Sequence, residues 1–115
     1  MPFLAVTTNH AVPDDQKTEI LKKLSATVAQ ALGKPEQYVM VNLQANPDML
    51  FAGSAEPLAY LELKSIGLPH DRTKELSATL AKSVEETLGV PANRVYVEFA
   101  DAERHLWGWN GGTFA

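Results

Sequence analysis

Two stretches of this chain, Ile20–Val41 (ILKKLSATVAQALGKPEQYVMV) and Leu76–Val97 (LSATLAKSVEETLGVPANRVYV), align with each other at an offset of 56 residues. In each, apolar residues recur every four positions up to a Gly-x-Pro, the pattern of one helix face that ends at the glycine. An alternating run rich in β-branched residues follows the proline, which is typical of a strand. Because matched pairs continue on both sides, we interpret the chain as a duplication of one unit.

Each half predicts a strand, a helix and a second strand. The expected elements are a strand over Pro2–Thr8, a helix from near Pro13 to Leu32, and strands over Tyr38–Ala45, Leu58–Lys64 and Arg94–Ala100, with the second helix over His70–Leu88. Strands joined through such a helix run parallel with a right-handed crossover. The prediction is therefore an α+β fold, a four-stranded mixed sheet with two helices on one face. We expect a single domain over residues 1–115, with repeats at about 2–45 and 58–101.

Two segments lie outside the repeats. Met49–Ala52 is an apolar run that we expect to add an edge strand, and Asp101–Ala115 carries a predicted helical turn followed by two Trp and one Phe. We expect a tail with this many apolar side chains to pack on its own core or on a neighbouring subunit. No third helix is long enough to cover the other sheet face, so we expect that face to be buried against other subunits.

Composition excludes several classes of function. The chain has 115 residues, a formal charge of -4 and no cysteine. The acidic balance argues against a nucleic-acid partner, and the lack of cysteine excludes disulfides, thiolate nucleophiles and thiolate metal ligands. His10, His70 and His105 have no spacing typical of a metal site. No run approaches a membrane span or a signal peptide, so the expected location is cytoplasmic, with export by another route left open.

Pro2 is the first candidate for chemistry. Initiator Met is usually removed before a small residue, and removal of Met1 would leave Pro2 with a free secondary amine. Ordinary α-amino groups titrate near ~7.7–8.0, and burial among apolar neighbours lowers that pKa. A neutral amine near pH 7 suits a general base that moves a proton beside a carbonyl. The alternative is that Pro2 merely starts the chain, and with Met1 attached its nitrogen is an amide and no base.

The chain resembles the macrophage migration inhibitory factor family, including its dopachrome tautomerase relatives. The motifs that carry the resemblance run in order along the whole chain: Met1-Pro2-Phe3, Gly33–Tyr38, Gly53–Pro57, Ser65-Ile66-Gly67, Asn93–Val97 and Gly108-Trp109-Asn110 with Thr113-Phe114-Ala115. The resemblance implies a homotrimer whose sheets line a central channel, with active sites at subunit boundaries. It also implies cofactor-independent keto–enol tautomerisation of phenylpyruvate-like acids or dopachrome analogues.

The resemblance also implies roles for single residues. Pro2 is the catalytic base, Lys34 faces the substrate carboxylate, and Tyr96 comes from the neighbouring subunit. The other implied substrate-binding residues are Ser65 and Ile66 at a strand end, with the Ile66 N–H as a donor, and Trp109 and Phe114 as an aromatic wall. Each of these also has a purely structural interpretation. Lys34 could be a surface lysine, Ser65 and Ile66 a strand end, and Tyr96 a half-buried strand aromatic. Trp109 and Phe114 could simply pack the tail.

Two departures from the family pattern put the substrate in doubt. Glu98 stands where the family has an Asn two residues after the active-site Tyr. In the pocket it would raise the pKa of the Pro2 amine and weaken acid binding, unless it pairs with Lys34 or Arg104. Trp107 replaces a small aliphatic residue before Gly-Trp and would narrow the pocket mouth. We therefore include Glu98 and Trp107 among the candidate substrate-binding residues.

Other departures concern the activities of vertebrate members. Leu58–Leu61 occupies the place of their Cys-x-x-Cys, so thiol–disulfide chemistry is excluded here. The loop Thr8–Val12 has no Arg, the residue that the family links to receptor engagement, which weakens the case for receptor binding. Two alternatives to an enzyme stay open. One is a secreted signalling protein with vestigial tautomerase activity, and the other is a ferredoxin-like binding module without catalysis.

Overall fold

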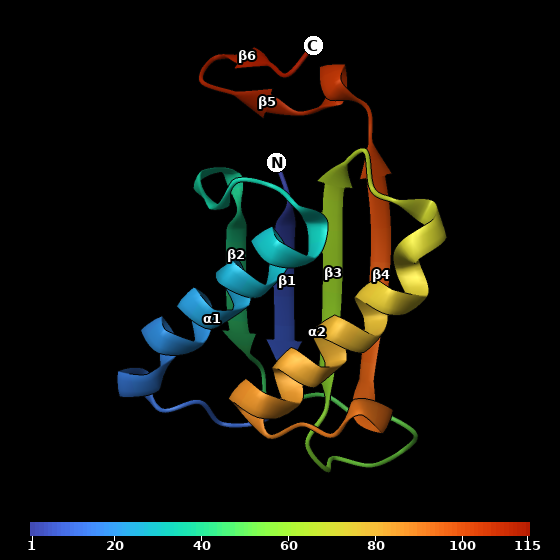
Figure 1. The fold of residues 1–115 in the computed structure, drawn as a ribbon. Helices are drawn as coiled ribbons and strands as arrows, with labels where there is room; N and C mark the ends of the chain where they lie inside the picture. Colours follow the sequence, from blue (N-terminus) through green and yellow to red (C-terminus); the bar gives the residue numbers. More distant parts are fainter.

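A computed structural model describes residues 1–115 and contains the predicted mixed sheet. Its four strands are β1 (Phe3–Thr8), β2 (Met40–Ala45), β3 (Ala59–Ile66) and β4 (Val95–Ala102), in the order β2-β1-β3-β4. Within each half the two strands are parallel, and β1 and β3 join the halves as antiparallel neighbours (Figure 1). The start of β1 therefore lies at the same end of the sheet as the ends of β3 and β4.

The helices α1 (Asp14–Leu32) and α2 (Thr73–Leu88) end in the same way. Gly33 and Gly89 both adopt left-handed conformations, with φ of 63° and 72°, which glycine reaches without a steric penalty. The N–H of Gly89 bonds back to the carbonyl of Glu85, and the N–H of Lys34 bonds to that of Ala29. These bonds satisfy carbonyls that the helix end leaves free. A proline follows in each half and turns the chain toward the next strand.

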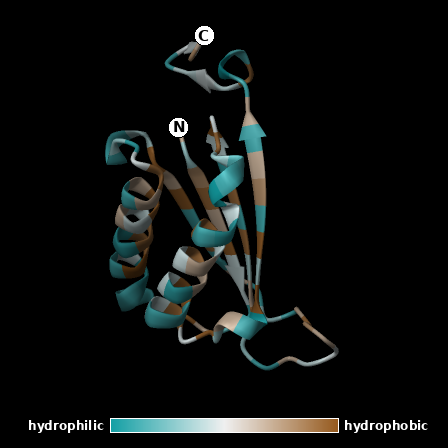
Figure 2. Cartoon of the chain, turned by 45° about the vertical axis from the view of Figure 1, so that its right-hand side comes forward, coloured by the Kyte–Doolittle hydropathy of each residue, from teal (hydrophilic) through white to brown (hydrophobic).

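Both helices pack on one face of the sheet, and the core lies between the two layers (Figure 2). Period-two burial in the strands and a four-residue spacing in the helices supply this core. Its fully buried members include Leu4, Val6, Leu61 and Leu63 from the sheet and Leu24, Val28, Leu80 and Val84 from the helices. No helix is long and apolar enough to cross a membrane.

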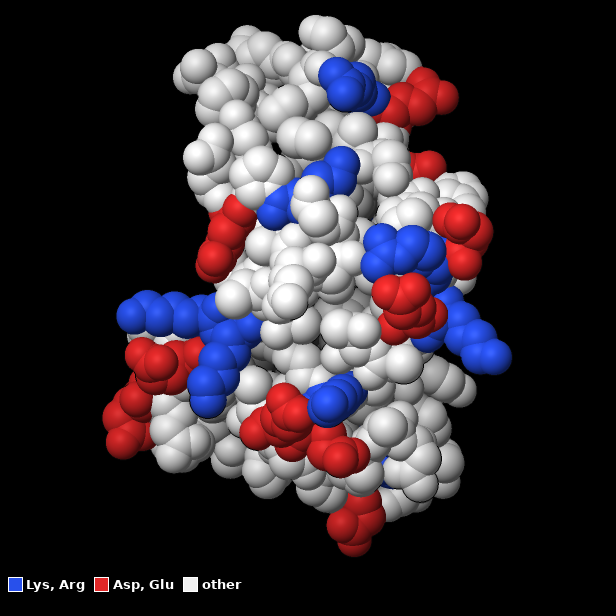
Figure 3. Space-filling model, in the orientation of Figure 1, with Lys and Arg blue, Asp and Glu red and all other residues white.

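The opposite face of the sheet has no helix over it. Its side chains form rows across the strands, because the register places Phe3 opposite both Met40 and Lys64. Met40 is 67% exposed and Tyr96, on the same face of β4, is 65% exposed. The chain itself thus leaves large apolar side chains in solvent on this face, as its sequence predicts. On the helix face, by contrast, acidic and basic side chains are interspersed (Figure 3).

The expected edge strand at Met49–Ala52 is wrong. Phe51 and Ser54 instead pair with each other across a tight turn, in which Ala52 and Gly53 both have positive φ. Arg94 fixes this turn by donating to main-chain carbonyls. Its acceptors are Phe51 (2.8 Å), Ser54 (3.0 Å), Glu56 (2.9 Å) and Pro57 (3.3 Å).

Element boundaries differ from the prediction in small ways. Glu36–Tyr38 and His70–Arg72 are 3₁₀ turns rather than the start of a strand and of an α-helix. After Ala102 the chain forms the expected helical turn at Arg104–Leu106 and then a hairpin, β5 (Gly108–Trp109) and β6 (Gly112–Thr113). This tail lies beyond the end of the sheet where the N-terminus begins (Figure 1).

Candidate active site

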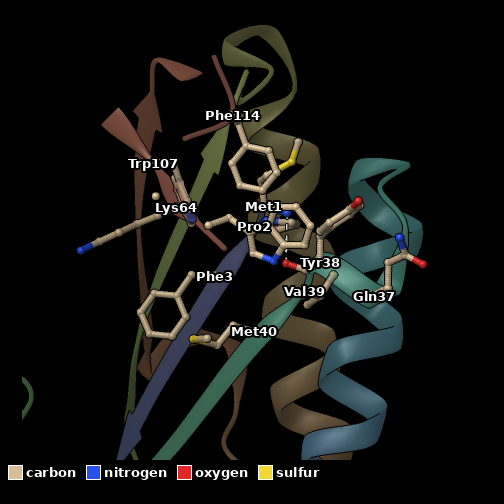
Figure 4. Close-up of a pocket in the computed structure, with 12 residues that line it drawn as sticks. Met1, Pro2, Phe3, Gln37, Tyr38, Val39, Met40, Lys64, Trp107 and Phe114 are labelled. Atoms are coloured by element: carbon tan, nitrogen blue, oxygen red, sulfur yellow. Dashed lines mark hydrogen bonds between the residues drawn. The ribbon is translucent and has the colours of Figure 1, made fainter. Parts of the chain in front are cut away.

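A cavity of about 400 Å³ lies between the N-terminus and the tail (Figure 4). Four parts of the chain meet there: the residues at the start of β1, the 3₁₀ turn leading into β2, the end of β3 and the tail. The lining residues are Met1, Pro2, Phe3, Gln37, Tyr38, Val39, Met40, Lys64, Trp107, Gly108, Trp109 and Phe114. Of the residues expected at the site, the structure brings four together here: Pro2, Trp107, Trp109 and Phe114.

Pro2 lies fully buried at the floor of this cavity. It stands directly before β1, and its carbonyl accepts a hydrogen bond of 3.0 Å from the N–H of Met40 at the start of β2. The parallel pairing of β1 with β2 therefore fixes its position. Proline suits this place because its missing N–H removes no ladder bond at the first position of a strand.

The wall of the cavity is aromatic. Trp109 and Phe114 stack with ring centroids 5.8 Å apart, and both make edge contacts with Tyr38, at 5.8 and 6.0 Å. A tight turn brings the two tail rings together, since Asn110 and Gly111 both have positive φ, as a two-residue hairpin loop requires. Such a wall can hold a flat ring by stacking and edge contacts.

The N-terminal amine lies inside the site. The Met1 amine donates a hydrogen bond of 3.0 Å to the carbonyl of Tyr38. Partial burial and, second, the positive charge of Lys34 hold the pKa of this amine below its ordinary value. Both causes disfavour an ammonium group here. An amine at this end of the chain is therefore a weaker base than one in solvent, and a larger fraction of it is neutral, with a free lone pair, near neutral pH.

Lys34 is not among the residues that line the cavity. Its Nζ donates to the carbonyl of Ile66 at 3.4 Å, which anchors the ammonium at the end of β3. No Asp or Glu is among the lining residues, and no Asp or Glu forms an ion pair with Lys34. Nearby positive charge without an opposing carboxylate favours an anionic ligand.

Ser65 and Ile66 do not line the cavity of this protomer. Ser65 is fully buried, and its hydroxyl donates to the carbonyl of Ile66 at 3.2 Å. Ile66 contributes a carbonyl acceptor to Lys34, whereas the sequence interpretation assigned it a donor N–H. The Ile66 carbonyl thus positions Lys34 within the protomer, and the Ser65 hydroxyl shares that acceptor.

Tyr96 and Glu98 lie outside the cavity, on the uncovered face of β4. Tyr96 packs on Phe51, with ring centroids 4.6 Å apart, toward the other end of the sheet. Glu98 accepts a hydrogen bond of 2.6 Å from the hydroxyl of Tyr60, and this bond is the main cause that raises the pKa of Tyr60 to about 12. Glu98 therefore pairs with neither Lys34 nor Arg104.

The sequence did not indicate several of the lining residues, above all Tyr38, Lys64 and Met40. Their proximity follows from strand register, which places Lys64 and Met40 on either side of Phe3. One signal for the tail was present, since Asn110-Gly111 is a common pair in two-residue hairpins. No group of three or more His, Asp or Glu side chains could hold a metal ion.

Comparisons with known proteins agree with this architecture. The family model described as macrophage migration inhibitory factor (MIF) matches residues 1–115. A macrophage migration inhibitory factor homolog of Brugia malayi is 40% identical over 99% of each chain, and the Xenopus tropicalis macrophage migration inhibitory factor is 35% identical over the full length of both. The crystal structure of a Prochlorococcus marinus homologue superposes with a TM-score of 0.90 at 42% identity, covering 98% of this chain and 99% of that one. The chain therefore belongs to the macrophage migration inhibitory factor family.

Proposed function

We propose that this protein is a cofactor-independent keto–enol tautomerase of the phenylpyruvate or dopachrome isomerase type. Pro2, freed by removal of Met1, is the general base. Lys34 attracts the substrate carboxylate, and the aromatic wall of Trp107, Trp109 and Phe114 holds the ring. The reaction moves one proton within one molecule, so it needs neither an oxidant nor a second substrate.

One observation carries the proposal: Pro2 is buried at the floor of an aromatic cavity where burial and Lys34 already lower the pKa of the chain's amine. After Met1 is lost, the amine moves one residue deeper, to the Pro2 nitrogen. We expect burial and the Lys34 charge to lower the pKa of that nitrogen too, because Pro2 lies deeper than Met1 and Lys34 stays in place. Loss of Met1 also removes a side chain that now lines the cavity.

The proton transfer balances without further groups. The Pro2 lone pair takes a proton from the carbon beside the keto group, and that C–H electron pair becomes the C=C bond of the enol. The carbonyl oxygen gains the negative charge while Pro2 carries the abstracted proton as a secondary ammonium, and this ammonium then gives the proton to the oxygen, which completes the enol and regenerates the neutral amine. In the reverse direction the same ammonium returns the proton to carbon. Positive charge from Lys34 stabilises the developing oxyanion.

The uncovered sheet face supports a homotrimer with sites between subunits. Tyr96 lies toward the far end of the sheet from Pro2, so it can join a Pro2 cavity only if that cavity belongs to another copy. Exposed Met40 and Tyr96 give this face the apolar side chains that a subunit interface needs. Light scattering on the native protein tests this assembly, and a monomer at micromolar concentration would contradict it.

The test of the base is a Pro2→Gly variant. Intact mass first establishes that Met1 is absent from both proteins, so that both present a free amine. Enol–keto conversion of phenylpyruvate, followed by absorbance, should fall about 10²–10⁴-fold in kcat/KM. Unchanged turnover in that variant would exclude Pro2 as the base. Signalling independent of the pocket, the main alternative, would survive the same substitution.

A further inference from the structure

We propose that Arg72 is a positioning residue for the tautomerase reaction, which fixes the end of α1 so that Lys34 is held in place for the substrate carboxylate. Arg72 touches neither the substrate nor the reacting atoms and acts through Lys34. This inference rests on the proposed function, since it concerns the same site. All the contacts that carry it lie within one protomer.

The carbonyl of Ala31, in the last turn of α1, has no donor in the main chain. The residue four positions later, which supplies the N–H in a continuing helix, is Pro35, and proline has none. Arg72 supplies the missing donor: its Nη2 donates to the Ala31 carbonyl at 2.9 Å and to the carboxylate of Glu75 at 2.9 Å. A charge-assisted hydrogen bond therefore holds the helix end just before Lys34.

The segment that carries Arg72 is itself held against the end of the sheet. Arg72 closes the 3₁₀ turn His70–Arg72, in the connection between β3 and α2. Asp101 of β4 binds this connection, because its carboxylate accepts a hydrogen bond of 3.0 Å from the N–H of Leu68 and lies 2.9 Å from the imidazole of His70. The guanidinium thus reaches α1 from a segment that is attached to β4.

Lys34 meets the same connection at a second point. Its Nζ donates to the carbonyl of Ile66, at the end of β3, over 3.4 Å. So long a hydrogen bond orients a flexible four-carbon stem only weakly. The bond from Arg72 to Ala31 restricts the backbone from which this stem starts, and thereby keeps the ammonium near the terminal amine. A charge that is already in place needs less ordering when an anion binds.

The second repeat lacks this bond. At the offset of 56 residues the matched positions are Ala31 with Thr87, Pro35 with Pro91 and Arg72 with Gln16. Gln16 and Thr87 line one small cavity, but the Gln16 side chain donates no hydrogen bond to the Thr87 carbonyl. The helix end that leads to Lys34 is thus held by a guanidinium, whereas the one that leads to Val90 is not. Helix capping alone would be needed equally in both repeats.

The experiment is a double-mutant cycle of Arg72→Met and Lys34→Met. It is measured as the Kd of phenylpyruvate, from tryptophan fluorescence, and as KM. Arg72→Met should raise both about three- to fivefold, less than the roughly tenfold effect expected for Lys34→Met. In the Lys34→Met background the same change should alter Kd less than about twofold, because Arg72 then has no lysine to position. Two independent contributions would multiply instead.

The pH profile is a readout that a loss of stability alone would not move. The charge of Lys34 is, after burial, the second cause that lowers the pKa of the terminal amine. A displaced ammonium should let that pKa rise, so Arg72→Met should shift the rising limb of kcat/KM to higher pH. The other titratable side chains of the cavity, Tyr38 and Lys64, are unchanged throughout the cycle. A shift that persists in the Lys34→Met background would come from the Arg72 charge itself and would overturn the proposal.

Gln16→Met is the matched control at the other helix end, and it should change neither Kd nor the pH limb. An effect equal to that of Arg72→Met would make helix stability the cause and exclude positioning. Circular dichroism first establishes that each variant is folded, and Arg72→Gln, with a shorter and uncharged side chain, replaces Arg72→Met if that variant is not.

The two hypotheses fail in different ways. A cycle in which the two substitutions multiply would exclude the role of Arg72 and leave the tautomerase intact. Coupled effects on Kd in a protein without turnover would contradict the tautomerase and retain Arg72 as the residue that positions Lys34.

Discussion

The two ends of the sheet are related by the internal duplication but differ in chemistry. At the offset of 56 residues, Pro2 corresponds to Leu58 and Lys34 to Val90. Each end adjoins a cavity, of about 400 Å³ beside Pro2 and about 390 Å³ beside Leu58, and the second is lined only by apolar residues. A free α-amino group exists only at the N-terminus, and Leu58 follows a peptide bond. Duplication could therefore copy the framework but not the base.

The segment that follows the second strand of each repeat borders one of the two cavities and forms its roof. Each roof contains a tight turn whose two central residues have positive φ, Ala52-Gly53 in one and Asn110-Gly111 in the other. Arg94 donates hydrogen bonds to main-chain carbonyls of the first roof. Tyr38, which occupies the corresponding position of the first repeat, contacts the rings of Trp109 and Phe114 in the second roof. The roof held by hydrogen bonds faces an apolar cavity, whereas the roof held by ring contacts covers the candidate active site.

The largest expected stability effect is at Leu58. Leu58→Ala should lower the free energy of unfolding by about 2–5 kcal/mol, because Leu58 is 2% exposed and truncation leaves a void. Most of the turnover should remain under native conditions, in contrast to Pro2→Gly. Urea unfolding followed by circular dichroism measures the first quantity, and phenylpyruvate turnover the second. If Leu58→Ala were as inactive as Pro2→Gly, the idea that the Leu58 end serves stability and the Pro2 end serves catalysis would be wrong.

The next largest effect is at Arg94. Arg94→Met should destabilise the protein by about 1–3 kcal/mol, since it leaves up to four carbonyls without their donor. Hydrogen exchange should rise around Phe51–Pro57 and stay unchanged in the tail. Tyr38→Leu is the matching change at the other roof. It should increase hydrogen exchange only in the tail and should raise the KM for phenylpyruvate. Increased exchange at both roofs in either variant would contradict their independence.

Most of the framework was readable from the sequence, because helices and strands of this kind depend on local periodicity. Ile20, Leu24 and Val28 repeat at a helical spacing and are buried as that spacing predicts. The prediction of a strand at Met49–Ala52 was wrong because a short apolar run alone does not distinguish a strand from a turn. The hydrogen bonds that hold this turn come from Arg94, which is distant in sequence. Pro2 was predicted as an amine that removal of Met1 would free, and the roles of Trp109 and Phe114 came from the family resemblance, whereas Lys64 required strand register. Contacts across strands depend on pairing, which one sequence does not specify.

Lys34 should affect binding and pH dependence together. Lys34→Met should raise KM for phenylpyruvate about tenfold, or 1.4 kcal/mol, through loss of a charged partner for the carboxylate. The cation lowers the pKa of the amine beside it. Its removal should therefore raise that pKa, and the rising limb of kcat/KM should move to higher pH. Lys82→Met, on the outer face of α2, should change neither. A limb that shifts to lower pH would exclude this electrostatic role.

The smallest effect concerns the uncovered face, at Tyr60. Its pKa is raised to about 12, first by the hydrogen bond to Glu98 and then by desolvation. The fold thus favours the neutral phenol, so this stabilising contribution is intact below the ordinary pKa of 10 and is lost as pH rises through about 12. Absorbance at 295 nm should show one tyrosine that ionises late, and Tyr60→Phe should remove that step. Glu98→Gln should move it toward 10, since the carboxylate no longer opposes the phenolate. If the step stays near 12 in Glu98→Gln, another group sets the Tyr60 pKa, and Glu98 is free to act elsewhere on the face that carries Tyr96.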